Sequence, residues 1–125
     1  MIEQVIVNHT ERNYFNDYDE IRSDRMTNVS PESVRKAIDK LVRRFRGSGT
    51  SDVMFVRYSD NTGYRLMYQR VGMESYEHPV FGTMYKGGED KLMLRHFTNY
   101  EYEGWDREEA VTIADAKQLI IGKEQ

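Results

Sequence analysis

"DVMFVRYSDNTGYRLMYQRVG", residues 52–72, has the pattern of a β-hairpin. Two runs rich in β-branched and aromatic residues flank "DNTG" at residues 60–63, and such a pair of runs around turn-forming residues predicts two antiparallel strands. If Ser59 pairs with Tyr64, one face of the hairpin carries Val53, Phe55, Arg57, Tyr64, Leu66, Tyr68 and Arg70. The other face carries Met54, Val56, Tyr58, Arg65, Met67, Gln69 and Val71.

Neither face of this hairpin is cleanly polar. A sheet with one face in water alternates apolar and polar side chains, so we expect both faces of this sheet to be covered. One cover is a helix. The other is a second subunit, a ligand or the termini of the chain.

The helix is predicted directly before the hairpin. Ser30 is a favourable N-cap, Pro31 suits the first turn, and Gly47 and Gly49 end the pattern. An apolar stripe recurs at helical spacing, formed by Val34, Ile38, Leu41, Val42 and Phe45. The opposite face is basic, with Arg35, Lys36, Lys40, Arg43 and Arg44. This face is either an ordinary solvated surface or a binding surface for phosphates or an acidic partner.

Further elements flank this helix and hairpin. Glu3–His9 predicts a strand, and Thr10–Val29 an irregular connection. Two further strands, Val80–Lys86 and Lys91–Phe97, flank "GGED", and Tyr100–Glu103 continue the sheet. A last helix begins at one of two capping boxes, Asp106 with Glu109 or Thr112 with Asp115, and ends near Gly122. The sequence therefore predicts an α+β fold, an antiparallel β-meander of about four to five strands with one helix before it and one C-terminal helix.

Composition limits the class of protein. The 125 residues and 14.8 kDa suit one domain, residues 1–125. The absence of cysteine excludes disulfides and thiolate chemistry and fits a reducing cytoplasm. A net charge of −3 argues against a general nucleic-acid coat protein. The N-terminal residues have neither a basic region nor a long apolar run, so we expect no signal peptide and no membrane partner.

Signatures of catalysis are missing from the sequence. His9, His78 and His96 lie far apart and none has a partner at metal-site spacing. There is no G-x-S-x-G motif, and the glycine-rich residues 46–52 follow a helix, whereas a phosphate-binding loop precedes one. We therefore expect no enzyme, no cofactor and no metal.

Carboxylates gather near the C-terminus at Glu101, Glu103, Asp106, Glu108 and Glu109. A charged helix start explains them, because acidic groups are favourable at helix N-termini. Acid–base chemistry, metal binding and mimicry of a nucleic-acid backbone are the alternatives.

Arginines among aromatic residues are the main functional signal. An arginine beside an aromatic ring presents a planar donor fork next to a stacking surface, which suits a phosphate joined to a base or ribose. In the register above, Arg57 and Arg70 share a face with Phe55, Tyr64 and Tyr68. Arg107, placed in the first turn before the last helix, is positioned to reach a ligand at that helix N-terminus. Ion pairing with the many acidic residues is the structural alternative.

The layout resembles that of the phage-encoded anti-Thoeris sponges, which sequester cyclic ADP-ribose-type signals without hydrolysing them. The shared features are the helix "SPESVRKAIDKLVRRF", a strand with Arg57, a later strand with Phe81 and a terminal helix entered through Arg107. The resemblance covers most of the chain and includes no invariant motif. Family members bind their ligand at subunit interfaces through arginines and an aromatic residue, which implies that Arg57, Phe81 and Arg107 contact the ligand.

Two functions are therefore expected as alternatives. The first is a non-enzymatic homo-oligomer of phage or mobile-element origin in the host cytoplasm. It sequesters an anionic nucleotide-like immune signal of the cyclic ADP-ribose type. Its ligand-binding residues are Arg57, Phe81, Arg107, Arg70 and Tyr68. The second is an anti-CRISPR-like inhibitor that presents the acidic, tyrosine-rich residues 99–109 to a host defence protein. A nucleic-acid binder that uses the basic helix face is a third, weaker possibility.

Overall fold

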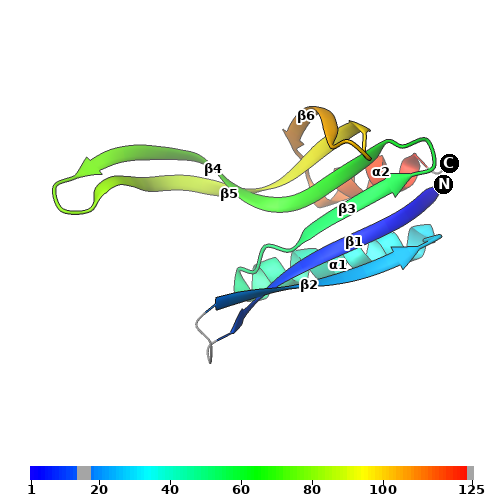
Figure 1. The fold of residues 1–125 in the computed structure, drawn as a ribbon, viewed down its shortest axis with the longest axis horizontal. Coiled ribbons are helices and arrows are strands. Elements are labelled where there is room, and N and C mark those ends of the chain that lie inside the picture. Colours follow the sequence, from blue (N-terminus) through cyan, green and yellow to red (C-terminus); the bar gives the residue numbers. More distant parts are fainter. Residues whose placement is uncertain (14–17, 124–125) are drawn as a thin grey trace.

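The computed structural model describes residues 1–13 and 18–123, with side chains described outside residues 10–20. Its elements are β1 (Ile2–Asn13), β2 (Tyr18–Thr27), α1 (Pro31–Ser48), β3 (Val53–Tyr58), β4 (Gly63–His78), β5 (Gly82–Asn99), β6 (Gly104–Ala110) and α2 (Ile113–Gly122). The strands form one six-stranded antiparallel sheet in the order β2-β1-β3-β4-β5-β6. Both helices pack against the same face of the sheet (Figure 1).

The predicted α+β class is confirmed, but the sheet has six strands where four to five were expected. The extra strand lies in the segment that was predicted to be irregular. This strand is β2, which pairs with β1 from Thr27 opposite Gln4 to Tyr18 opposite Asn13. β2 is an edge strand, and its described side chains are mostly exposed, so it needs no apolar alternation to be stable. Residues 14–17 of the same prediction lie outside the described residues.

The first hairpin turns where the sequence predicts, but its register differs. Met54 pairs with Leu66, and Phe55 pairs with Arg65. The observed register differs from the expected one by an odd number of residues. Each face of β3 therefore lies beside the β4 side chains that were expected on the opposite face of the sheet. The turn begins before the expected Ser59–Tyr64 pair, because the Tyr58 amide donates to the Thr62 carbonyl oxygen at 2.9 Å. Arg57 consequently shares a face with Arg65, not with Tyr64 and Tyr68 as expected.

The second hairpin is also placed differently. β4 continues to His78 and β5 begins at Gly82, so the turn lies at residues 79–81 and "GGED" lies inside β5. Gly72, Gly87 and Gly88 have positive φ angles where the β4–β5 pairing skips from Val71 to Met73. Glycine adopts this backbone conformation without steric strain, and the β4–β5 register is the same on both sides of these residues.

From these glycines onward, the ribbon of residues 72–88 extends away from the rest of the sheet (Figure 1). We call residues 72–88 the arm. Large apolar side chains are exposed along it: Met73, Tyr76, Val80, Phe81 and Tyr85.

Both helices begin as local signals predict. The Ser33 amide of α1 donates to the Ser30 hydroxyl oxygen at 3.2 Å, and Gly49, with φ of 73°, ends the helix. α2 uses the second of the two capping boxes, with Thr112 as N-cap. Neither helix in the described part of the chain is long and apolar enough to cross a membrane.

The core lies between the helices and one face of the sheet. Its fully buried side chains include Val34 and Ile38 of α1, Ile120 of α2, and Met54 and Leu66 of the sheet. Neither helix covers the opposite face, which we call the open face. One of the two covers expected from the hairpin pattern, the helix, is therefore present.

Candidate functional site

A cavity of about 510 Å³ lies on the open face. It is lined by side chains from β3, β4, β5 and β6 and from the β5–β6 connection: Phe55, Arg57, Arg65, Arg95, Phe97, Tyr100, Glu101, Glu103 and Trp105. Alternation along the strands explains this gathering, because Met54, Val56 and Leu66 face the helices and their chain neighbours therefore face the other way. We call it the arginine cavity.

Two of the three arginines meet on one carboxylate. The Arg65 Nη2 and Arg95 Nε atoms lie 3.0 and 2.8 Å from Oε2 of Glu108. The side chains of Arg65, Arg95 and Glu108 are each no more than 24% exposed, so their charges are only partly screened by water.

The third arginine, Arg57, is paired less closely. Its Nη2 atom lies 3.4 Å from Oε2 of Glu3. The Nε atoms of Arg57 and Arg65 are buried and have no hydrogen-bond acceptor in the described part of the chain. A buried N–H without an acceptor is unfavourable, so an oxygen atom of a ligand at either position would be stabilised.

The electrostatic environment of Arg65 also favours an anion. Burial lowers the pKa of Arg65, and the positive charge of Arg95 lowers that pKa further, while Glu108 opposes both effects. A guanidinium remains charged in proteins, so the shift means that the cation is held at an energetic cost. A negatively charged group bound beside Arg65 would reduce that cost.

Aromatic rings lie beside the guanidinium groups. The Arg95 guanidinium carbon lies 4.3 Å from the centroid of the Trp105 ring, and the Trp105 side chain is half exposed. Phe97 and Tyr100 contact each other edge to face, with centroids 5.6 Å apart. Burial raises the pKa of Tyr100, so its hydroxyl group remains a neutral hydrogen-bond donor and acceptor.

Of the five predicted ligand-binding residues, only Arg57 lies in the arginine cavity. Tyr68 points toward the helices and stacks on Phe45, with ring centroids 3.9 Å apart. Arg70 lies next to the arm, where its Nε donates to the Gly87 carbonyl oxygen at 3.1 Å and its Nη1 lies 3.3 Å from Asp90.

Phe81 and Arg107 are also elsewhere. Phe81 is 72% exposed near the tip of the arm. Arg107 lies on β6 and lines a separate cavity with Tyr64 and His96, so it is not in the turn before the last helix as predicted. Within one chain, the structure does not bring the five predicted residues together.

The acidic C-terminal segment is not a helix start, because residues 104–110 form β6. Its carboxylates do not form one group. Glu108 lies with Arg65 and Arg95, whereas Oε2 of Glu109 lies 3.1 Å from Nε2 of His96. Adjacent residues of a strand point to opposite faces of the sheet, so Glu108 and Glu109 lie on two different surfaces.

Arg95, Trp105 and Glu108 belong to the site, although the sequence did not predict them as members. They are brought together by the pairing of β5 with β6, in which Arg95 is opposite Glu108. A signal existed in "LMLRHF", residues 92–97, where alternation places Leu92 and Leu94 on one face and Arg95 on the other. The expectation that residues 106–109 form a capping box or the turn before the last helix concealed the other half of the pair.

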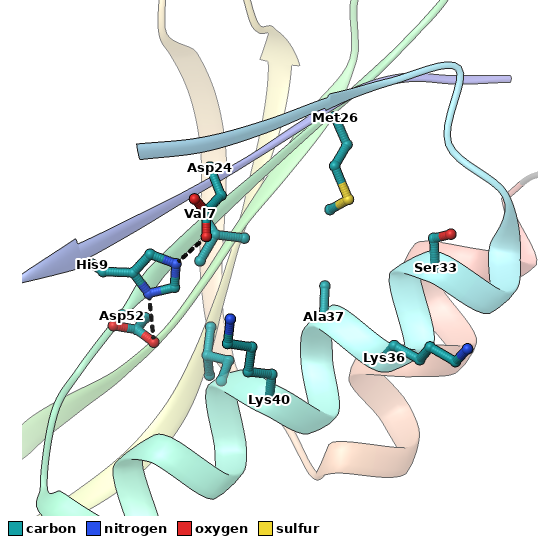
Figure 2. A pocket seen from close by; sticks show the side chains of 10 residues that line it. Val7, His9, Asp24, Met26, Ser33, Lys36, Ala37, Lys40 and Asp52 are labelled. Carbon is teal, nitrogen blue, oxygen red and sulfur yellow. Dashed lines mark hydrogen bonds and ion pairs between the residues drawn. The ribbon is translucent and has the colours of Figure 1, made fainter. Parts of the chain in front are cut away.

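A second cavity, of about 320 Å³, lies between α1 and the β1–β2 pair (Figure 2). His9 is at one end of it and is 1% exposed. Its Nε2 donates to Oδ2 of Asp24 at 2.7 Å, and its Nδ1 lies 3.1 Å from Oδ2 of Asp52. Oδ2 of Asp52 also accepts from Nε of Arg44 at 2.6 Å.

This cluster connects β1, β2, α1 and the connection before β3. Each ring nitrogen of His9 lies close to a carboxylate oxygen, so the ring is a buried link between elements that are distant in sequence. No sequence spacing indicates the cluster, because its four residues come from separate parts of the chain.

Comparison with protein-family models, with curated proteins and with solved structures found no match for this chain. In the described residues, no group of three or more histidine, aspartate or glutamate side chains is arranged to hold a metal ion. The chemistry of the arginine cavity is therefore the basis for proposing a function.

Proposed function

We propose that this protein is a non-enzymatic binding protein that sequesters an anionic nucleotide-like ligand in the arginine cavity. The observation that carries the proposal is the convergence of Arg57, Arg65 and Arg95 with aromatic rings, including the half-exposed Trp105, in one cavity. A guanidinium fork matches two phosphate oxygens, and a ring face stacks on a base. The volume of about 510 Å³ is in the range of small-molecule sites.

The cavity also contains carboxylates, which narrows the class of ligand. Glu101 and Glu103 contribute to its lining, so the site is not a simple positive trap for any anion. Carboxylates accept hydrogen bonds from ribose hydroxyl groups in many nucleotide sites. A ligand with phosphates for the arginines, hydroxyl groups for Glu101 and Glu103, and a base for Trp105 uses all three kinds of group.

We infer that the cavity binds its ligand without turnover. The described lining residues include no histidine, serine or lysine that could form a nucleophile–base pair. His9 is buried in the other cavity, and His96 is on the helix side of the sheet. A protein that retains its ligand unchanged acts by mass action, so it must bind tightly and be abundant relative to the ligand.

The exposed apolar side chains of the arm favour a homo-oligomer. Val80 and Phe81 are 78% and 72% exposed, and exposed apolar surface of this kind marks protein contacts. A two-stranded ribbon by itself is only marginally stable in water, so a packing partner is expected. We infer that the arm packs against a second copy and delivers Phe81 to the arginine cavity of that copy.

The resemblance in layout to phage signal-sequestering proteins favours a cyclic ADP-ribose-type immune signal as the ligand. It also favours a phage or mobile element as the source and the host cytoplasm as the location. The carboxylates and aromatic rings of the cavity suit a ligand with two riboses and a base.

The experiment that tests this function combines calorimetry with native mass spectrometry, using ADP-ribose as the probe. We expect ADP-ribose to bind the wild-type protein, to be released unchanged on denaturation, and to bind Arg57→Ala and Arg65→Ala much more weakly. The matched control is Arg43→Ala, an exposed arginine of α1 on the helix side of the sheet. Equal binding to wild type and both cavity variants would contradict the proposal, as would conversion of the probe.

A further inference from the structure

Two arginines of the arginine cavity already pair with an anionic side chain of the protein. Glu108 contributes a single oxygen, Oε2, to both Arg65 and Arg95, at 3.0 and 2.8 Å. This geometry uses one N–H group of each guanidinium, although an arginine has five. The Glu108 carboxylate therefore offsets the charge of Arg65 and Arg95. It does not accept from most of the N–H groups of these two arginines, including the buried Nε of Arg65.

Glu108 lies at the edge of the sheet. It lies on β6, an edge strand that pairs with β5 alone, and the pairing is irregular between His96 and Phe97 and between Phe97 and Asn99. The side chain is 20% exposed, so it borders the solvent and is not locked in the core. An edge side chain can rotate away without breaking the apolar core on the opposite face.

We propose that Glu108 holds the place of an anionic group of the ligand, and that binding exchanges the Glu108 carboxylate for a phosphate at Arg65 and Arg95. This inference rests on the proposed function. The diphosphate of ADP-ribose carries two negative charges and four non-bridging oxygens, whereas a carboxylate carries one charge and two oxygens, so the diphosphate satisfies more of the guanidinium donors.

The exchange has two consequences for the site. In the free protein, Glu108 counters the repulsion between Arg65 and Arg95, which lowers the pKa of Arg65 in addition to the larger effect of burial. For ligands, Glu108 is a competitor that a weakly charged anion does not displace. The residue thereby selects a diphosphate over a carboxylate or a halide, at a cost in affinity.

The test uses the fluorescence of Trp105, the single tryptophan in the sequence, whose ring lies under the Arg95 guanidinium. Wild type, Glu108→Gln and Glu109→Gln are titrated with inorganic pyrophosphate and with ADP-ribose. Glu108→Gln removes the competing charge while keeping the size of the side chain. Glu109→Gln is the same change at the next residue, which contacts His96 and not the cavity.

We expect Glu108→Gln to bind both probes at least about tenfold more tightly than wild type, a change of about 1.4 kcal/mol. Glu109→Gln is expected to match wild type. If wild type binds ADP-ribose and Glu108→Gln binds it no better, the exchange is wrong and the proposed function stands. If only Glu108→Gln binds pyrophosphate and wild type does not bind ADP-ribose, the exchange stands and the proposed function is wrong. Absence of binding in every protein rejects both.

A second measurement uses only the wild-type protein and therefore does not depend on the folding of a variant. In wild-type protein with ¹³C-labelled glutamate, the carboxyl resonance of Glu108 is expected to shift toward that of a solvated glutamate when pyrophosphate is added. A Glu108 resonance that stays unchanged while the probe binds would overturn the exchange.

Discussion

The Arg95 guanidinium lies over the ring of Trp105, 4.3 Å from its centroid, at the junction of β5 and β6. A cation above an aromatic face is attracted by the ring quadrupole, and the contact orients the guanidinium plane. The same Arg95 reaches Glu108 through Nε at 2.8 Å. One side chain thus joins the charged part of the arginine cavity to its aromatic part.

Replacing Arg95 by alanine is expected to weaken ADP-ribose binding by about tenfold or more, because a hydrogen bond to a charged group contributes about 1.5–3 kcal/mol. Isothermal titration calorimetry measures the change. Arg43→Ala, on the opposite side of the sheet, serves as the control. Unchanged affinity in Arg95→Ala would remove Arg95 from the site.

Replacing Phe81 by serine is expected to dissociate the oligomer without unfolding the chain, since Phe81 is 72% exposed and outside the core. Light scattering after size-exclusion chromatography gives the mass of the assembly, and circular dichroism reports the fold. Tyr102→Ser removes an aromatic residue of similar exposure, 77%, that is outside the arm. If the Phe81 and Tyr102 variants have the same mass as wild type, the arm does not form the interface.

Replacing Tyr68 by alanine is expected to lower the free energy of unfolding by about 1–3 kcal/mol, because it removes the stack on Phe45 and part of the packing against α1. The affinity for ADP-ribose is expected to stay the same, since Tyr68 points away from the arginine cavity. Urea denaturation and calorimetry separate these two effects. A stable variant with weakened binding would restore the role that the sequence predicted.

Acid is expected to destabilise the protein partly through Asp24. The hydrogen bond from His9 lowers the pKa of Asp24 below its ordinary value. A carboxyl whose pKa is lower in the folded state stabilises the fold at pH values above the pKa of the unfolded chain. That stability is lost as the pH falls through the lower, folded value.

The measurement is the urea midpoint of wild type and Asp24→Asn between pH 7 and about pH 3, which brackets the ordinary aspartate pKa of about 3.9. The variant is expected to lose less stability over this range than wild type. Asp90→Asn, which removes an exposed carboxylate near Arg70, is the control and is expected to follow the wild-type curve more closely. Parallel curves for wild type and Asp24→Asn would contradict the assignment.

The sequence by itself determined the features that depend on local chemistry. Ser30 and Gly49 bound α1, and "DNTG" turns the chain between β3 and β4. Each of these signals acts through residues a few positions apart, where caps and turn conformations are set. The α+β class follows from the same signals together with the periodicity of the apolar residues.

Only the tertiary structure decided which side chains share a surface. An odd shift in the β3–β4 register places Arg57 beside Arg65, and strand pairing outcompetes the capping box that Asp106 and Glu109 suggest. The His9 cluster depends in the same way on contacts between distant segments. Side chains alternate with a period of two along a strand, so the partner strand, and not the local sequence, determines the composition of each face.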